Sequence, residues 1–392
     1  MFLWDWICRE ANMRLSEICE VYSGYAFTSF NDIKDGFPVV KIGNILADGT
    51  LNLEKCQYTT DIVNEKYYSK KGDIYIALSG ATTGKIGIMS LNQKYVINQR
   101  VGIVRQKSVD IPQEYIKYFL LRQTDRILQE ATGCAQPNIS PKQIAEYVIP
   151  DISKEQMQEI CEVLNRIKKI IDSRKGELVA LDDLIKARFV EMFGTLDSPS
   201  CEFQKATLKE LCNKITDGKH GGCQAEDGTG RYFVGAREIY DDKVHYDTAP
   251  EINIDEFEKD YKRCNIEIGD FLIVNTGATI GKSAIATDER TEHTLLQKSV
   301  ALLKVKKEVL NPVFLKWCYR VNTQMYIVES ASAQPNLLLS KINSTVIFVP
   351  NINLQNQFAD FVKQIDKSKS AVQKALDETQ MLFDSLMQEY FG

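Results

Sequence analysis

The sequence predicts an α+β protein in which two pseudo-symmetric mixed α/β domains are separated by two long antiparallel coiled-coil helices. The first observation behind this prediction is a duplicated loop. Residues 79–87 read SGATTGKIG, and residues 276–282 read TGATIGK. Gly281 follows Gly84 by 197 residues (281 − 84). A period this long indicates duplication of a whole domain and not a solenoid of short repeats.

The second observation is that the surroundings of the loop are duplicated in the same order. Each loop follows an apolar segment that begins with Gly-Asp, at residues 72–73 and 269–270. The tetrapeptide AQPN occurs at 135–138 and 333–336, and Phe-Gly occurs at 193–194 and 391–392. We therefore expect one domain over 13–150 and a second over 201–350, each large enough to bury its own core.

The third observation concerns residues 151–200 and 351–392, where the apolar period changes. Ser153 and Gln156 form a capping-box pattern, and apolar residues then recur at spacings of four and three, which is typical of a coiled-coil seam. The seam residues are Ile160, Leu164, Ile167, Ile171, Leu178, Leu181 and Ile185, then Phe358, Val362, Ile365, Val372, Leu376, Phe383 and Leu386. Arg174, Lys369 and Thr379 are polar seam positions. The alternative is that each helix only covers its own domain.

Shorter elements follow from local patterns. Several short β-branched runs punctuated by glycine predict a small, mostly β globule in each half. Helices are expected over about 113–131 and 313–330, the second with Asn311 as N-cap and Pro312 at its first position. Ser140 and Gln143 form another capping box. The second long helix is expected to begin after Asn353.

Composition narrows the functional class. The chain has 392 residues, 44% hydrophobic and 26% charged, and its net charge is −5. Any nucleic-acid surface therefore has to be local or shared with partners. Ten cysteines without C-x-x-C spacing and only three histidines argue against structural zinc and for reduced thiols in the cytoplasm. No apolar run reaches a membrane-spanning length. Charged residues interrupt residues 1–12, so a signal peptide is not expected, and Met13 is an alternative start.

The Gly-x-x-x-Gly-Lys loops invite comparison with a nucleotide-binding P-loop. That loop has four residues between Gly and Gly-Lys, followed by Ser or Thr and a helix, whereas here there are three residues and Ile86 follows Lys85. A tight β-hairpin is the simpler interpretation. It does not by itself explain why small hydroxyl residues and a lysine recur at its tip.

Those residue types suit nucleic acid, because hydroxyls and backbone amides bind phosphate oxygens and Gln, Asn and Arg can pair with base edges. The repeated candidates include Gln136 and Asn138 with Arg100 in one half, matched by Gln334 and Asn336 with Lys298 in the other. Base-reading residues should lie where the two copies differ. The Gln-Pro-Asn element is equally consistent with a structural turn. The full DNA-binding set is Tyr25, Asn44, Ser79, Thr82, Thr83, Lys85, Arg100, Gln136, Asn138, Lys219, His220, Arg237, Thr276, Thr279, Lys282, Lys298, Gln334 and Asn336.

The sequence lacks the motifs of three kinds of catalysis. The sequence has no Asn/Asp-Pro-Pro-aromatic motif of methyl transfer, no glycine-rich cofactor loop after a strand, and no cluster of carboxylates and lysine for phosphodiester cleavage. We therefore expect a chain that binds and does not catalyse, with no catalytic residues and no metal. The alternative is an enzyme that binds nucleotides with the duplicated Gly-x-x-x-Gly-Lys loops.

In duplicate and in order, these features resemble the specificity subunit of type I restriction–modification systems over essentially the whole chain after residue 12. The resemblance rests on the S/T-G-A-T-x-G-K loop, the A-Q-P-N element, the Ile/Val-Pro exit into a capped long helix, and the final Phe-Gly. It implies two target-recognition domains, over 13–150 and 201–350, that read an asymmetric bipartite site in double-stranded DNA. It also implies a central helix (151–200) and a distal helix (351–392) that set the spacing.

The same resemblance implies partners and cofactors. Two methyltransferase subunits would dock on the helices and methylate adenine at N6 with S-adenosylmethionine, and restriction subunits would use ATP and Mg²⁺ to cut DNA. This chain would bind none of these cofactors itself. The family's pattern departs here mainly in the first dozen residues.

Overall fold

The computed structural model describes residues 12–131, 137–326 and 336–392. The chain divides into two compact units by its internal contacts. Unit 1 comprises the chain up to Arg174 together with Ala375–Gly392, and unit 2 comprises Lys175–Lys374. Each long helix therefore contributes one half to each unit, whereas the sequence suggested helical segments distinct from the domains.

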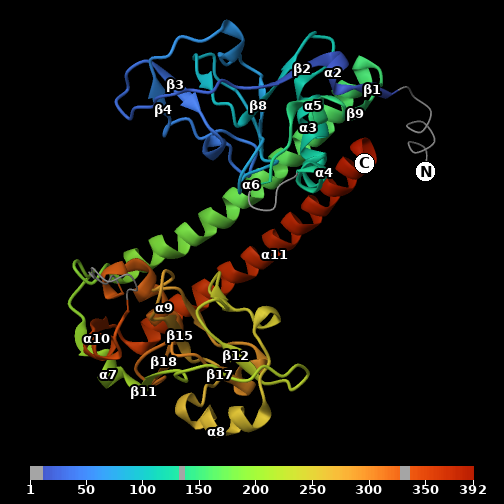
Figure 1. Ribbon diagram of the computed structural model, residues 1–392. Helices are drawn as coiled ribbons and strands as arrows, with labels where there is room; N and C mark the ends of the chain where they lie inside the picture. Colours follow the sequence, from blue (N-terminus) through green and yellow to red (C-terminus); the bar gives the residue numbers. More distant parts are fainter. Residues whose placement is uncertain (1–11, 132–136, 327–335) are drawn as a thin grey trace. The chain divides into compact units, whose positions relative to one another are not determined.

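Unit 1 is built on an antiparallel four-stranded sheet (Figure 1). In spatial order its strands are β2 (Cys19–Ser23), β8 (Val101–Gln106), β5 (Ile74–Ala77) and β6 (Ile86–Ile88). All four residues of β5 are buried, which explains why this strand reads as a continuous apolar run and does not alternate. The two edges of β5 are hydrogen-bonded to β8 and β6. Both of its faces are covered as well, because Ile74 and Ile76 belong to one buried cluster and Tyr75 and Ala77 to another.

Smaller elements complete unit 1. A second sheet has the order β4 (Gln57–Thr59), β3 (Phe37–Val40) and β7 (Val96–Ile97), with β3 and β7 parallel. Strand β1 (Asn12–Arg14) pairs with β9 (Val148–Pro150). The helices are α2 (Leu15–Ile18), α3 (Gln113–Arg122), α4 (Thr124–Glu130) and α5 (Pro141–Ala145), with 3₁₀ turns η1 (Ile42–Asn44) and η2 (Glu65–Tyr67).

Unit 2 repeats this plan, which confirms the predicted duplication. Its main sheet has the order β11 (Cys212–Asp217), β18 (Val300–Val305), β15 (Phe271–Val274) and β16 (Ser283–Ile285). The parallel pair is β12 (Tyr232–Val234) with β17 (Thr294–Leu296), and the antiparallel pair is β10 (Gln204–Thr207) with β19 (Val346–Val349). The helices are α7 (Leu208–Leu211), α8 (Ile254–Cys264), α9 (Pro312–Val321) and α10 (Leu339–Ser344), with η3 (Tyr246–Thr248), η4 (Glu289–His293) and η5 (Thr323–Met325).

Unit 2 also has a hairpin and a helix that unit 1 lacks among the described residues. The hairpin joins β13 (Ile239–Tyr240) to β14 (Lys243–Val244) through Asp241 and Asp242, both with positive φ. Two residues with positive φ define a type I′ turn, which matches the twist of paired strands and which Asp tolerates. Helix α8 is capped by the side chain of Asn253.

The predicted caps of the short helices are confirmed, but the two helices expected over 113–131 and 313–330 are shorter than predicted. The side chain of Asn311 accepts from Val313 N at 2.8 Å, with Pro312 at the first position of α9, and Ser140 and Gln143 form the predicted box. The helix expected over 113–131 is interrupted at Gln123 between α3 and α4. The helix expected over 313–330 ends at Val321, and residues 327–330 lie outside the described part of the chain.

The long helices are α6 (Lys154–Phe193) and α11 (Ile352–Phe391). Gln156 N donates to Ser153 Oγ at 3.3 Å and Ser153 N donates to Gln156 Oε1 at 2.8 Å, so the predicted capping box opens α6. Helix α11 begins slightly earlier than expected, with Asn351 Oδ1 accepting from Asn353 N. Every predicted seam residue of both helices is buried or half-buried.

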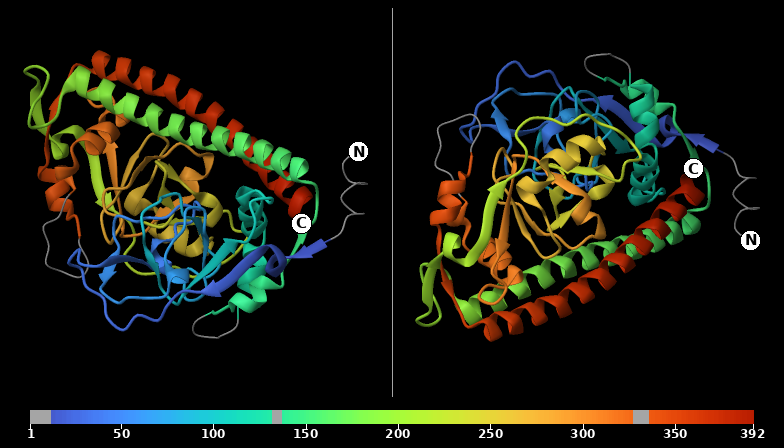
Figure 2. Two further views of the ribbon diagram at one scale, coloured as in Figure 1. Left: turned by 90° about the horizontal axis from the view of Figure 1, so that it is seen from above. Right: turned by 90° about the horizontal axis from the view of Figure 1, so that it is seen from below.

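The helices pair antiparallel within each unit, as predicted (Figure 2). In unit 1, Arg174 donates to Ala375 O and Thr379 Oγ1, while Leu164 belongs to the same buried cluster as Phe391. In unit 2, Lys369 Nζ lies 2.7 Å from Asp182 Oδ1, and Arg188 lies near Phe361. The polar side chains of the seam therefore join α6 to α11. The alternative, that each long helix only covers its own domain, is wrong.

The repeated Phe-Gly closes a core in each unit. Phe193 contacts Phe314 at 4.9 Å and Phe358 at 5.7 Å between ring centroids in unit 2. Phe391 contacts Tyr115 at 5.1 Å in unit 1. Gly194 follows with φ +76°, and its N–H donates to Val190 O at 2.8 Å, which ends α6 in the left-handed conformation that glycine favours.

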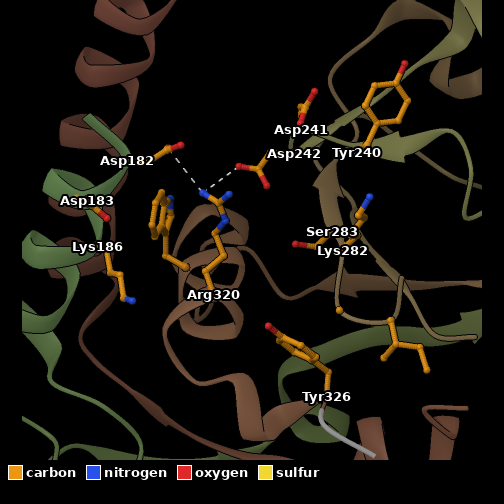
Figure 3. A pocket seen from close by; sticks show the side chains of 13 residues that line it. Asp182, Asp183, Lys186, Tyr240, Asp241, Asp242, Lys282, Ser283, Arg320 and Tyr326 are labelled. Carbon is orange, nitrogen blue, oxygen red and sulfur yellow. Dashed lines mark ion pairs between the residues drawn. The ribbon is translucent and has the colours of Figure 1, made fainter. Parts of the chain in front are cut away.

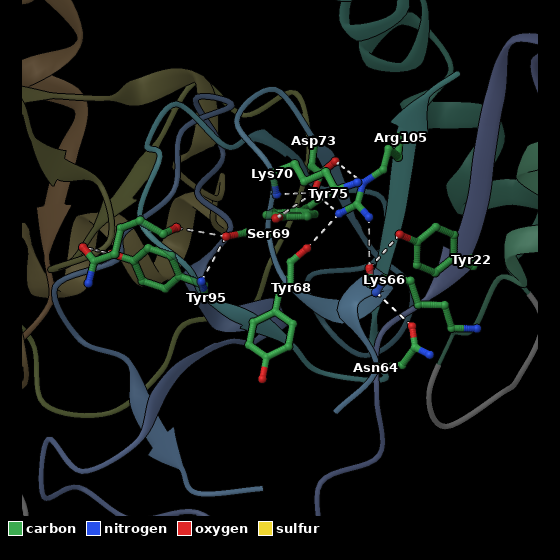
Figure 4. A network of polar contacts seen from close by, with 11 residues as sticks. Tyr22, Asn64, Lys66, Tyr68, Ser69, Lys70, Asp73, Tyr75, Tyr95 and Arg105 are labelled. Atoms are coloured by element: carbon green, nitrogen blue, oxygen red, sulfur yellow. Dashed lines mark hydrogen bonds and ion pairs between the residues drawn. The ribbon is translucent and has the colours of Figure 1, made fainter. Parts of the chain in front are cut away.

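The repeated Gly-Asp is also explained by packing (Figure 4). Asp73 accepts from Lys70 N at 2.8 Å and is ion-paired with Arg105, which also donates to Tyr68 O. In unit 2 the corresponding Asp270 is paired with Lys304 Nζ at 2.9 Å, although burial still raises the pKa of the Asp270 carboxyl.

None of the helices in the described part of the chain combines the length and the apolar character that a membrane span requires.

Candidate nucleic-acid interface

The repeated loop is the tip of a β-hairpin in both units. Residues 78–85 join β5 to β6, and the hairpin is closed by Gly84 N to Ala77 O and Ala77 N to Lys85 O, both at 2.9 Å. Gly80 and Gly84 have φ of +82° and +83°, and their counterparts Gly277 and Gly281 have +93° and +92°. Only glycine adopts such angles at little cost.

This geometry disfavours the nucleotide-binding alternative. A phosphate-binding P-loop passes from a strand into a helix, whose N-terminal amides hold the phosphates. Here each loop returns into a strand antiparallel to the first, β6 after β5 and β16 after β15. No helix N-terminus follows either loop.

Two of the hydroxyl groups that were predicted to contact DNA are not available for it in this loop, because one is hydrogen-bonded and the other is shielded. Thr83 is 6% exposed, and its hydroxyl lies 2.7 Å from Gly80 O and 3.2 Å from Pro137 O. Thr82 Oγ1 is shielded from solvent and has no hydrogen-bond partner among the described residues. The geometry therefore favours a loop-holding role for Thr83. Of the remaining predicted tip residues, Lys282 is exposed, while Ser79, Lys85, Thr276 and Thr279 are half-buried.

The Pro-Asn part of the AQPN element pairs with the hairpin tip. Asn138 forms a β-bridge with Ser79, and Asn336 forms the equivalent bridge with Thr276. Ile139 N donates to Leu78 O at 2.9 Å. The backbone of this element therefore has a structural role, as one of the two interpretations held, while the side chains of Asn138 and Asn336 are exposed. Gln136 and Gln334 lie outside the described residues.

Neighbouring loops join the hairpin tip along one edge of unit 1. Tyr25 N donates to Ile97 O at 2.7 Å, and Gln99 N donates to Tyr25 O at 2.8 Å. Leu78 N then donates to Arg100 O at 2.9 Å. We call this set the loop edge: residues 24–26, 40–44, 78–85, 97–101 and 137–139 in unit 1, and 217–220, 234–238, 275–282, 296–300 and 336–338 in unit 2.

The loop edge of unit 2 has the same backbone hydrogen bonds. Lys219 N donates to Leu296 O at 2.7 Å, Lys298 N to Lys219 O at 3.0 Å, and Asn275 N to Ser299 O at 3.0 Å. Lys219 therefore occupies the position of Tyr25, and Lys298 that of Gln99. The counterpart of Arg100 is Ser299, so the matching of Arg100 with Lys298 from sequence was wrong by one residue.

Asn44 and Glu238 also occupy equivalent positions. Asn44 is 8% exposed; its Oδ1 accepts from Lys41 N at 2.8 Å and its Nδ2 donates to Asn52 O at 2.9 Å. Glu238 Oε2 accepts from Gly235 N at 2.8 Å in the same way. Both side chains hold their loop, which favours a structural role for Asn44.

Two predicted residues of unit 2 are paired with acidic side chains. Lys219 Nζ lies 2.8 Å from Asp260 Oδ2 and 3.7 Å from Glu256 Oε2, and the hydrogen bond that Lys219 donates to Asp260 raises the pKa of Lys219. His220 Nε2 lies 3.0 Å from Asp217 Oδ2. DNA would have to compete with these carboxylates. The sequence did not reveal the first contact because Glu256 and Asp260 belong to α8, which is remote in the chain.

Unit 1 instead carries an aromatic cluster at the same place, which the sequence analysis missed. Tyr25 is 39% exposed and lies 5.2 Å from Phe27 and 5.5 Å from Tyr67 between ring centroids. Lys66 Nζ lies 4.8 Å from the centroid of Tyr67. Exposed rings beside lysine can make apolar or stacking contacts with bases. The signal available in the sequence was the four aromatic residues within residues 22–30, namely Tyr22, Tyr25, Phe27 and Phe30.

A pocket of about 480 Å³ lies beside the hairpin tip of unit 2 (Figure 3). Arg320 Nη1 lies 3.0 Å from Asp242 and 3.8 Å from Asp182, and Asp242 also pairs with Lys316, whose pKa is lowered by burial. The lining includes Lys282, Lys186 and Tyr326 but also Asp183 and Asp241. These carboxylates do not suit a phosphate. No group of His, Cys, Asp and Glu in the described residues could hold a metal ion.

The chain is similar in sequence and in fold to known specificity subunits of type I restriction systems. The Escherichia coli type I restriction enzyme EcoBI specificity subunit is 21% identical over 412 residues, covering 96% of this chain and 84% of that protein. The S subunit of a type I restriction–modification system from M. genitalium has the same fold, with a TM-score of 0.54, 14% identity, and 97% and 96% of the two chains covered. A chain from a structure on complex assembly and conformational transition of the type I R-M system gives a TM-score of 0.60 at 15% identity, with 97% of each chain covered.

The family match agrees with the duplication. A family model described as the type I restriction modification DNA specificity domain matches residues 10–182 and again residues 201–379. Each match contains one repeated hairpin and one loop edge. Together they span most of the chain, which therefore belongs to the family of type I restriction–modification DNA specificity subunits.

Proposed function

We propose that this chain reads a bipartite DNA site, with unit 1 recognising one half and unit 2 the other. The observation that carries this proposal is that one loop edge is built twice on the same backbone hydrogen bonds but with different exposed side chains. A shared backbone places both edges alike against a duplex. Different exposed side chains on the two loop edges then give each half its own preference.

The hairpin tips supply the part of binding that is independent of sequence. Lys85 and Lys282 recur at equivalent positions, and lysine contributes counterion release when it neutralises a phosphate. Residues that are the same in both units suit a contact common to every DNA sequence. Phosphate contacts of this kind fix the orientation of the protein without reading bases.

The long helices are proposed to set the spacing of the half-sites and to dock two methyltransferase subunits. Both helices carry large apolar side chains on the outside, including Ile170 (45% exposed), Val179 (62%) and Met381 (64%). Exposed apolar residues on a helix suit burial against a partner protein. In this proposal the methyltransferase subunits methylate adenine with S-adenosylmethionine, restriction subunits use ATP and Mg²⁺, and this chain acts without a cofactor in the cytoplasm.

Methylome sequencing tests the proposal. A host that expresses this chain with its modification subunit should acquire methylated adenines within one motif that has two specified halves and an unspecified spacer. A host with the modification subunit alone should lack that motif. The purified chain alone should transfer no labelled methyl group to DNA, and transfer by the chain free of partners would contradict its non-catalytic role.

A further inference from the structure

Two arginines on the loop edges differ from all others in the described part of the chain. The side chains of Arg100 and Arg237 are exposed, and neither makes a hydrogen bond, ion pair or ring contact with another described residue. Every other described arginine has such a partner. These are Arg14, Arg105, Arg122, Arg126, Arg166, Arg174, Arg188, Arg231, Arg263, Arg290 and Arg320.

The two free arginines occur once in each unit and at different positions of the edge. Ser299 occupies in unit 2 the position that Arg100 occupies in unit 1. This follows from equivalent hydrogen bonds, which Leu78 N donates to Arg100 O and Asn275 N donates to Ser299 O. Gly43 occupies in unit 1 the position that Arg237 occupies in unit 2. Each precedes by one residue the equivalent side chains of Asn44 and Glu238. No atom lies within 4 Å of the point that a Cβ of Gly43 would occupy, so unit 1 has open space there.

The backbone that carries each arginine is fixed, although the side chain is free. Arg100 N donates to Asn98 Oδ1 at 3.1 Å, and Arg100 O accepts from Leu78 N. Arg237 lies between Ala236, whose N donates to Ser299 Oγ at 3.2 Å, and the buried Glu238. A free guanidinium on a fixed backbone needs little reorganisation before it binds an external acceptor.

We propose that Arg100 and Arg237 each read one guanine, Arg100 in the half-site of unit 1 and Arg237 in the half-site of unit 2. This inference rests on the proposed function. The planar guanidinium donates two parallel hydrogen bonds to O6 and N7 of guanine in the major groove, a pattern that no other base presents there. Because the two arginines occupy different positions, the two guanines stand at different places relative to each hairpin.

The neighbouring cations fit this role less well. Lys219 and His220 are already paired with carboxylates. Lys85 and Lys282 are the same in both units and so cannot distinguish the half-sites. Lysine also lacks the planar fork that makes the contact with guanine bidentate.

The test uses the chain assembled with its modification subunits. The methylated motif of the wild-type complex is determined first, and then that of Arg100→Ala and Arg237→Ala. Each variant should lose its preference for one guanine in one half-site and leave the other half unchanged. Affinity for the original site should fall by about tenfold to a hundredfold, as expected for losing one bidentate base contact.

Modified DNA makes the test specific to the base. Replacing the assigned guanine by 7-deazaguanine removes the N7 acceptor. This replacement should weaken the wild-type complex but have no further effect on the matching alanine variant. Arg100→Lys should keep the salt dependence of binding while losing most of the preference. Arg14→Ala serves as a control, because Arg14 is exposed on β1 and paired with Glu146.

Other outcomes are equally informative. A variant that binds all sequences more weakly by the same factor would show that its arginine contacts phosphate, which would overturn the inference for that residue. An unchanged motif would overturn it as well. If the wild-type complex methylated no bipartite motif, the proposed function itself would fail, which the first measurement distinguishes before any variant is made.

Discussion

Arg105 and Asp73 form a buried, bidentate ion pair, with Nε 2.8 Å from Oδ1 and Nη2 2.6 Å from Oδ2. Their side chains are only 10% and 2% exposed. The pair links β8 to the turn that enters β5, at the end of β5 away from the hairpin that carries Lys85. Unit 2 has the same link in Asp270 and Lys304. The loop edge is therefore held from the side opposite to the proposed DNA contacts.

Asp73→Asn should destabilise unit 1 strongly. It leaves the Arg105 guanidinium buried without a charge partner, and breaking a buried pair in this way costs about 3–5 kcal/mol. The measurement is hydrogen exchange of the β5 and β8 amides, whose protection should fall while that of β15 and β18 in unit 2 is retained.

Arg105→Lys is the matched variant, because unit 2 uses lysine at the equivalent position. It keeps the charge but loses the bonds to Lys66 O and Tyr68 O, so its effect should be smaller than that of Asp73→Asn. Equal losses of protection in the two variants would show that charge pairing is not the main contribution.

Lys85→Ala and Lys282→Ala should each weaken binding to specific and non-specific DNA together. Loss of one phosphate contact lowers the slope of log affinity against log salt concentration by about one unit. Fluorescence anisotropy over a salt series with the assembled complex measures both quantities. Lys71→Ala is the control, because Lys71 is exposed beyond the other end of β5. A changed recognition sequence at unchanged affinity would contradict the assignment.

Exchange of residues 201–350 for the same segment of a relative should change one half of the methylated motif only. The exchange breaks no strand pairing, because β10 and β19 both lie inside the segment. The inserted segment has to pack against Phe189, Phe193 and Phe358. These side chains belong to the retained helices and lie in the core of unit 2. Methylome sequencing gives the result, and a motif altered in both halves would show that the units do not read independently.

Gly281→Ala should destabilise the unit 2 hairpin more than Gly277→Ala. Both glycines have φ above +90°, so alanine is strained at either by about 1–2 kcal/mol. At Gly281 the added Cβ would also lie 2.3 Å from ring atoms of Tyr326, whereas nothing lies within 4 Å at Gly277. Hydrogen exchange of the β15 and β16 amides compares the two variants, and equal effects would contradict the steric argument.

The sequence by itself determined the features that depend on local pattern. The duplicated loop, the capping boxes at Ser140 and Ser153, and the seam of both long helices involve residues close together in the chain. Their periodicity and spacing express backbone geometry directly. For the same reason the hairpin was preferred to a P-loop, since Ile86 begins another apolar segment and not a helix.

Only the tertiary structure decided which candidate side chains are free. Asn44 and Thr83 have the right chemistry for DNA, but backbone groups of their own loops occupy them. Lys219 meets Asp260 from α8, and Arg100 aligns with Ser299, because strand register fixes their neighbours. Such contacts join residues far apart in the chain, so no local spacing encodes them. Burial and hydrogen bonding between distant segments therefore separate the residues that hold the loop edge from those left exposed, among them Arg100 and Arg237.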